Sequence, residues 1–323
     1  MTYRSIPIEK GAPGYAAINP NTNIIYISYT SSNFILIVNI TEKSIEGRIS
    51  ANSPRNIIVN QVTNKVYVSS TDGIYEIDAL TNMSDVMNFG IPYSHGTVDV
   101  NQVSNTLYTT CFGSGDTITA IDLTKKVLID KFVVSKNSRF SSDVKLHGVA
   151  VHSSENKVYV INPFEKFIPV FDLEQSDKPL YSIQLEEGVS PKYILVNELS
   201  KLLYVKGTRG TPGGTWYEIL LVIDLDTKKE IQYARPPSLA QEGFALNRRS
   251  NTLYMKKDHE KAVLKLDAYA KKVIHTTTLG NRSFWQRFYE GFYYFGQIIA
   301  VNPSTNKVYV SDSKNNLLYE IKG

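Results

Sequence analysis

The chain repeats one arrangement of apolar and polar positions seven times. In each copy an apolar run ends at an Asn, a short turn segment follows, and a second apolar run contains a Tyr; the first copy reads INPNTNIIYIS from Ile18. Subtraction of the Tyr positions gives spacings of 41, 41, 51, 45, 50 and 55 residues, which is enough for four short strands with their loops. The repeated tyrosines are Tyr26, Tyr67, Tyr108, Tyr159, Tyr204, Tyr254 and Tyr309.

Each copy predicts four strands, which we call A to D. The two runs around the Asn are strands A and B, a third run such as ITAIDLTKK from Ile118 is strand C, and a fourth such as VLIDKFVV from Val127 is strand D. Runs rich in Val, Ile and Tyr and bounded by Asn, Asp and Gly are typical of strands. Several runs are apolar on both faces, which suits sheets packed face to face. The sequence therefore predicts an all-β, seven-bladed β-propeller with four antiparallel strands per blade.

The two ends of the chain are expected to complete one blade. The seventh copy stops after strand C, at LLYEIKG, and SIPIEKG from Ser5 parallels SIQLEEG from Ser182, which is a strand D. We therefore expect the N-terminal strand to close the last blade and remove its exposed edge. The expected single domain spans residues 1–323, with blades at about 12–52, 53–92, 93–135, 145–188, 189–235, 241–280, and 296–323 together with 1–9.

The repeated phrase resembles a known family. KVYVSS from Lys65, KVYVIN from Lys157 and KVYVSD from Lys307 resemble the repeats of YVTN-repeat propellers, and the resemblance covers all seven copies. Two positions depart from the pattern, since His152 stands where other copies have Asn and Lys201 replaces the Asn of the turn. The resemblance implies a propeller similar in fold to lactonase-type propellers and streptogramin lyase, and proteins of this kind are often found on microbial cell surfaces. It implies no particular activity.

Insertions gather on one predicted face. The A–B turns are short and uniform, whereas B–C loops lengthen at CFGSGDT from Cys111 and at the glycine-rich GTRGTPGGTWYE from Gly207, which we expect to be a flexible loop. Long D–A connections follow Ser135, Ala234 and Asn281. Because loops carry function more readily than the scaffold beneath them, we predict that binding uses this D–A/B–C face.

Polar residues stand at the predicted start of strand A, near the expected mouth of the central channel. A His at this place could act as a general base or ligand, since imidazole titrates near neutrality. Arg and Lys there could hold an anionic ligand together with a Glu. A solvated lining, or an ion pair across the channel, is the alternative. Five positions before the repeat's Asn, or before His152, stand Arg55, His147, Lys192, Glu242 and Gln297, with Gly14 and Gly96 in two other blades and His95 one residue before Gly96.

An aromatic insertion is the part least like the repeats. Eight aromatic residues crowd the twelve positions from Phe284 to Phe295 and include Trp285. They could pack to seal the blades, or they could form a lid or a partner-binding patch. Trp216, in the fifth B–C loop, could extend that patch.

Net charge, hydrophobicity and motif content disfavour several kinds of partner and binding site. The formal net charge is only +4 and no dense Lys/Arg run occurs, which disfavours nucleic acid as a partner. No stretch is long and apolar enough to span a membrane, and the first residues lack the apolar core of a signal peptide. The chain as written is therefore expected to be cytoplasmic, or extracellular if a leader has been trimmed. Cys111 has no second cysteine to pair with, and no EF-hand, HExxH or CxxC motif predicts a metal or cofactor.

These observations leave three functional hypotheses. The leading one is a non-catalytic binding propeller that takes a protein or small-molecule ligand on its D–A/B–C face. The second is a lactone hydrolase or lyase that acts at the channel mouth through His147 with Glu242 and Arg55. The third is a component of the cell surface or envelope.

Overall fold

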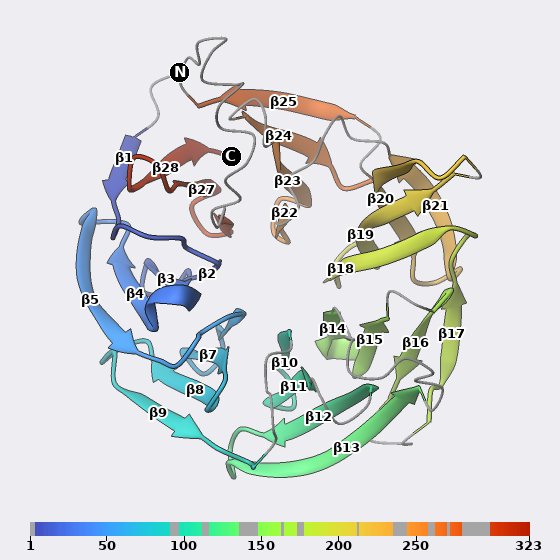
Figure 1. Ribbon diagram of the computed structural model, residues 1–323, viewed down its shortest axis with the longest axis horizontal. Coiled ribbons are helices and arrows are strands. Elements are labelled where there is room, and N and C mark those ends of the chain that lie inside the picture. The colour runs from blue at the N-terminus through green and yellow to red at the C-terminus, as the bar shows by residue number, and fades with distance from the viewer. Residues whose placement is uncertain are drawn as a thin grey trace. The chain divides into compact units, whose positions relative to one another are not determined.

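The computed structural model describes residues 4–90, 97–111, 116–135, 148–162, 165–172, 178–211, 213–234, 244–257, 262–269, 272–279 and 298–323. All strands of these residues belong to seven four-stranded antiparallel sheets, each with its strands side by side in chain order except the last (Figure 1). These sheets are the seven blades, so the predicted fold class, a seven-bladed β-propeller, is confirmed. The chain divides into two compact units, Arg55–Arg235 and Met1–Pro54 with Pro236–Gly323.

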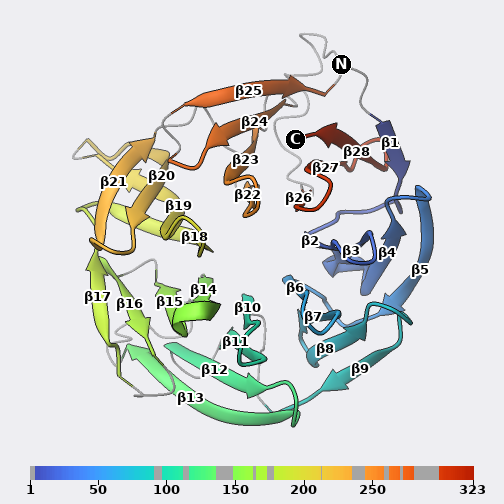
Figure 2. The ribbon, with the colours of Figure 1, turned by 180° about the vertical axis from the view of Figure 1, so that it is seen from behind.

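The Arg55–Arg235 unit contains blades 2 to 5. The first strands of neighbouring blades, β6 and β10, β10 and β14, and β14 and β18, contact one another, and Figure 2 shows these strands one after another in this order. Its sheets are β6 (Ile57–Asn60), β7 (Lys65–Ser70), β8 (Gly73–Asp78) and β9 (Ser84–Met87); β10 (Val98–Asn101), β11 (Thr106–Cys111), β12 (Asp116–Asp122) and β13 (Val127–Ser135); β14 (Gly148–His152), β15 (Lys157–Ile161), β16 (Phe167–Phe171) and β17 (Tyr181–Gln184); and β18 (Val189–Asn197), β19 (Leu202–Gly210), β20 (Trp216–Asp224) and β21 (Lys229–Ala234).

The other unit contains blades 1, 6 and 7. Here β2 contacts β26, and β26 contacts β22. Its sheets are β2 (Tyr15–Asn19), β3 (Ile24–Tyr29), β4 (Phe34–Asn39) and β5 (Ser44–Ser50); β22 (Phe244–Asn247), β23 (Thr252–Lys257), β24 (Ala262–Asp267) and β25 (Val273–Thr278); and β26 (Ile299–Asn302), β27 (Lys307–Asp312), β28 (Leu317–Lys322) and β1 (Arg4–Pro7). Two short 3₁₀ helices, η1 (Thr30–Ser32) and η2 (Ser153–Glu155), complete the elements formed by the described residues.

The N-terminal strand closes the last blade as expected. β1 pairs antiparallel with β28, from Arg4 opposite Glu320 to Pro7 opposite Leu317, and the two strands lie side by side in Figure 1, in blue and red. Ile6 of β1 is fully buried in a core cluster with residues of blades 1 and 7, such as Leu36 and Leu318. The sheet of blade 7 is thus built from both ends of the chain.

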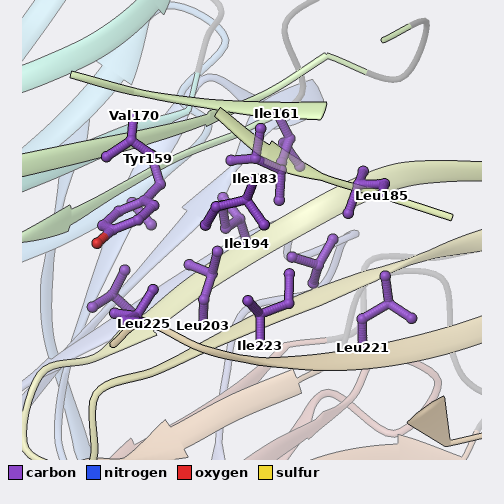
Figure 3. Packing of buried hydrophobic residues seen from close by; sticks show 14 of the residues in the cluster. Tyr159, Ile161, Val170, Ile183, Leu185, Ile194, Leu203, Leu221, Ile223 and Leu225 are labelled. Atoms are coloured by element: carbon purple, nitrogen blue, oxygen red, sulfur yellow. The ribbon is translucent and has the colours of Figure 1, made fainter. Parts of the chain in front are cut away.

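The repeated Tyr and its neighbours form the cores between blades. All seven repeated tyrosines are buried, and Tyr159 of β15 packs with Val170, Ile194 and Leu203 in the core shared by blades 4 and 5 (Figure 3). Apolar side chains on both faces of a strand serve two such cores, since each blade packs against a neighbour on either side. This explains the runs that do not alternate between apolar and polar residues.

The repeated Asn residues order the A–B turns and join neighbouring blades. Asn60 Oδ1 accepts the N–H groups of Val62 and Thr63, and Asn60 Nδ2 donates to Asn105 Oδ1 of blade 3 at 2.9 Å. Asn105 has φ of 54°, a left-handed conformation that Asn tolerates better than most residues. Equivalent Asn–Asn links join Asn101 to Asn156, Asn247 to Asn306, and Asn302 to Asn23.

Loss of one Asn–Asn link is expected to destabilise the protein measurably. Asn60→Ala removes three hydrogen bonds at a fully buried site, and each is worth about 1 kcal/mol, so we expect the free energy of unfolding to fall by about 2–3 kcal/mol. Urea denaturation measures this change. Val62→Ala, in the same turn but with an exposed side chain, is the matched control and should change the free energy by less than about 0.5 kcal/mol. Equal effects of the two substitutions would contradict this role of Asn60.

Candidate functional site

One end of each blade carries the start of its first strand, the end of its second and the start of its third. Antiparallel pairing puts these three places together, and they are the ends to which the B–C and D–A connections attach. We call this end the loop face. In the Arg55–Arg235 unit, two cations predicted to bind a ligand, Arg55 and Lys192, stand at the first strands of blades 2 and 5 on this face.

Arg55 lies two residues before the start of β6. Its backbone N–H donates to Ser69 O at 2.8 Å, and Asn56 O accepts from Ser69 N at 3.0 Å, so the main chain around it is fixed. The side chain is half-buried, and its Nε is a buried atom without a hydrogen-bond partner. No carboxylate of the described residues pairs with this guanidinium.

Ser69 adds a second unsatisfied polar group beside Arg55. In blades 1, 3 and 7 the equivalent hydroxyl accepts the N–H of the opposite strand, as Ser28 Oγ does from Tyr15 N at 3.0 Å. Ser69 Oγ is buried and has no such partner. A buried polar atom without a hydrogen bond is costly, so blade 2 departs here from the arrangement that stabilises the other blades.

Lys192 occupies an irregular position in β18. Pro191 pairs with Gly207 and Tyr193 pairs with Lys206, so Lys192 is the extra residue of a β-bulge. Bulges redirect side chains and are common beside functional sites. Lys192 is half-buried and, like Arg55, has no acidic partner among the described residues.

Blade 5 extends further at the loop face than its repeat predicts. Strands β18, β19 and β20 each have nine residues, and the extension consists of 189–191, 207–210 and 216–218. The segment from Gly207, expected to be a flexible loop, is therefore mostly paired strand. Its glycines permit close contact, because a Cβ on Gly207 would stand 2.3 Å from Ser190 O, and Gly210 N donates to Gly188 O at 3.0 Å.

A short connection turns the chain between β19 and β20. Thr211 N donates to Thr215 O at 2.8 Å, Gly214 N donates to Thr211 O, and Thr211 Oγ1 accepts from Thr215 N. Gly214 adopts φ of 79°, which glycine adopts without strain. These bonds join Thr211, at the end of the β19 side, to Gly214 and Thr215 on the β20 side.

Trp216 is the exposed aromatic residue of this extension. Its indole is packed over Gly210, with ring atoms 3.3 Å from where a Cβ on Gly210 would stand, yet the residue is 63% exposed. Its neighbour Tyr217 instead packs against the core of blades 4 and 5. Trp216 therefore presents a large apolar surface on a rigid support, as aromatic anchors in binding sites do.

Charged residues on the same extension are already paired. Arg209 Nη2 lies 2.6 Å from Glu186 Oε2, and the buried Lys206 has Nζ 3.6 Å from Glu218 Oε2 and 5.7 Å from the centre of the Tyr193 ring. Lys206 stands where blades 1, 2, 3 and 7 have Ser or Thr, a difference that is visible in the sequence. The pairing distinguishes these cations from Arg55 and Lys192.

Several predicted site residues cannot be placed. His95, His147, Glu242, Gln297 and Trp285 lie outside the described residues, as does the rest of the aromatic insertion. The lactonase or lyase hypothesis depends on His147 and Glu242, so it stays a prediction. In the described part of the chain no group of three His, Cys, Asp or Glu side chains is placed to hold a metal ion.

The sequence analysis missed one cluster of titratable residues. The two departures from the repeat, His152 and Lys201, lie at the joint between blades 4 and 5, where Glu155 and Glu198 approach the imidazole. The joint is at the end of the blades opposite the loop face. Each departure was visible in the sequence, but their proximity required knowing which turns of neighbouring blades meet.

Comparison with known proteins supports the fold and leaves the family open. Among solved structures, a chain of Kuenenia stuttgartiensis hydrazine synthase has a TM-score of 0.73 and 13% identity, with 98% of this chain and 97% of that chain covered. The β-propeller domain of Cps50 (Swd1) from Myceliophteria thermophila has a TM-score of 0.71 and 9% identity, with 98% and 99% covered. At such low identity the likeness shows the fold alone. No family model and no curated protein matches the sequence.

Proposed function

We propose that this protein is a binding propeller that takes an anionic partner on the loop face of its Arg55–Arg235 unit. The observation that carries the proposal is the state of Arg55 and Lys192, two half-buried cations at equivalent places in blades 2 and 5 without an acidic partner in the described residues. Partial burial of an unpaired charge costs free energy. A carboxylate or phosphate on the partner would offset that cost and form charge-assisted hydrogen bonds.

The blade 5 extension supplies the apolar part of the proposed surface. Trp216 follows a hydrogen-bonded turn and is 63% exposed, so the protein would lose little conformational entropy when a partner packs against it. Propellers serve generally as binding scaffolds, and this arrangement gives a place on the scaffold for the contact. The proposal concerns binding and assigns no chemistry to this face.

The test is binding of a defined panel of acidic peptides and small carboxylates at low ionic strength, measured by titration calorimetry. We expect at least one acidic probe to bind, and we expect Arg55→Ala and Lys192→Ala each to weaken it about tenfold, which corresponds to about 1.4 kcal/mol. Trp216→Ala should weaken it by a similar factor. Lys125→Ala, on the opposite end of blade 3 and exposed, is the matched control. Equal affinity of the control and the three variants would exclude this surface.

A further inference from the structure

The joint between the A–B turns of blades 4 and 5 is built differently from its neighbours. In the same unit, Asn60 with Asn105 and Asn101 with Asn156 form Asn–Asn links at the two preceding joints. At the third joint both partners are replaced, because His152 ends strand β14 and Lys201 takes the left-handed position with φ of 51°. The neighbouring joints have a pair of amide side chains, which do not titrate, whereas this joint has ionisable side chains at both positions.

The turn of blade 4 then depends on a carboxylate from blade 5. An imidazole cannot accept two adjacent N–H groups as the Asn amide does. Here Glu198 accepts two N–H groups of the turn, one residue earlier than those that the Asn accepts in other blades, from Ser153 N at 3.1 Å and Ser154 N at 3.5 Å. The turn itself is the 3₁₀ helix η2. The backbone of one blade is thereby held by a charged side chain of the next.

His152 is enclosed between two carboxylates. It is 2% exposed, its Nδ1 lies 3.3 Å from Ser154 Oγ, and its Nε2 is a buried atom without a hydrogen-bond partner. Glu155 Oε1 is 3.8 Å from Nε2, and Glu198 Oε2 is 3.9 Å from Nδ1. Both carboxylates are beyond hydrogen-bond distance of the imidazole but close enough to reach it by a small side-chain rotation.

The remaining charges around the imidazole are already engaged. Lys157 Nζ pairs with Glu155, and Lys201 Nζ pairs with Asp226 at 2.8 Å. Burial lowers the pKa of His152, which Glu155 and Glu198 oppose and Lys157 and Lys201 reinforce. The imidazole is therefore neutral at pH 7, and the unsatisfied Nε2 is compatible with that state.

We infer that the blade 4–5 joint is an acid-sensitive latch in which uptake of one proton by His152 transfers Glu198 from the backbone of blade 4 to the imidazolium. Protonation makes both ring nitrogens donors, with Glu155 beside Nε2 and Glu198 beside Nδ1. When Glu198 turns to the ring, the N–H groups of Ser153 and Ser154 lose their acceptor and η2 opens. The Asn–Asn links at the neighbouring joints have no such group and stay closed.

The direction of the pH effect follows from the lowered pKa. In the unfolded chain His152 takes up a proton near its ordinary pKa of about 6.5, whereas the folded chain resists until a lower pH. The stability that neutral His152 contributes is therefore complete above about pH 6.5 and is lost as the pH falls through the interval between the two pKa values. The inference does not depend on the proposed function, since the latch lies at the opposite end of the blades from the loop face.

Amide hydrogen exchange at single-residue resolution tests the latch in the full chain. Between pH 7.5 and 5, after correction for the intrinsic exchange rate, we expect protection of Ser153 and Ser154 to fall at least tenfold, while Val62 and Thr63 of the blade 2 turn keep theirs. The double variant His152→Asn with Lys201→Asn rebuilds an Asn–Asn link and should keep protection at both pH values. Unchanged protection of Ser153 and Ser154 in the native chain, or an equal loss in the double variant, overturns the inference.

A second measurement does not depend on the double variant folding. The imidazole ¹³C shift of His152, followed by NMR in the native chain, should titrate at lower pH than that of an unfolded peptide and in step with the loss of protection. Glu198→Gln keeps one acceptor for the turn but removes the charge, so protonation of His152 should move to still lower pH. A His152 titration that occurs without any change at Ser153 and Ser154 also overturns the inference.

Discussion

Removal of residues 1–9 is expected to lower the melting temperature of the protein by about 10 °C or more. The deletion takes away strand β1, and with it the main-chain pairing to β28 from Arg4 to Pro7. It also removes Ile6 and Ile8, both buried, and the loss of one buried Ile side chain costs about 2–5 kcal/mol. Tyr29 loses a partner as well, because its hydroxyl donates to Glu9 O at 2.8 Å.

Differential scanning calorimetry measures this effect, and two point variants separate its causes. Ile6→Ala should reproduce a large part of the loss, because the side chain is enclosed by residues of blades 1 and 7. Arg4→Ala is the control, since Arg4 is exposed in the same strand. If the truncated protein melted at the temperature of the native chain, β1 would not be closing blade 7.

The second large effect is expected at Gly73, the first residue of β8. Gly73 has φ of 147°, and a Cβ there would stand 2.5 Å from Met87 O, a backbone atom of β9 that cannot easily move. Gly73→Ala should therefore lower the free energy of unfolding by about 3 kcal/mol, from strain in a left-handed conformation together with the clash. Urea denaturation with a constant m-value checks this magnitude.

Gly47 provides the matched control for Gly73. It lies within strand β5, has no positive φ, and a Cβ there would meet nothing within 4 Å. Gly47→Ala should leave stability unchanged or raise it by about 0.5 kcal/mol, because alanine loses less conformational entropy on folding. A similar destabilisation at both positions would show that the close approach at Gly73 is not the cause.

The repeat could be recognised from the sequence because its Tyr and Asn residues have roles that depend mainly on their near neighbours in the chain. Each Tyr marks a buried position in strand B, and residues such as Asn60 and Asn101 mark A–B turns in which an amide oxygen accepts neighbouring N–H groups. These roles depend on residues close in sequence, so composition and spacing predicted the seven blades. Closure by β1 was also predictable, because the last copy lacked a strand and the first residues resembled one.

Positions that depend on contacts with residues distant in the sequence were less accessible to sequence reasoning. The glycines at 207 and 210 suggested a flexible loop, yet they allow close packing of β18, β19 and Trp216 within a longer sheet. Arg55 and Lys192 were identified by counting back from the repeat's Asn, but nothing in that count showed that no described acidic residue pairs with them. The cluster around His152 was missed because Glu198 belongs to the next blade and stands in an ordinary turn position.

Closure of blade 7 by both ends of the chain also sets a timing for folding during synthesis. Arg4 pairs with Glu320, so 316 residues must be synthesised after Arg4 before both partners exist. At about 5–20 residues per second, β1 emerges from the ribosome roughly 15–60 s before β28 exists. Throughout that interval the buried Ile6 and the unpaired edge of β1 have no native partner strand. Among the described strands, β1 therefore waits longest for its partner strand, and its unpaired edge is open to association with other chains for that time.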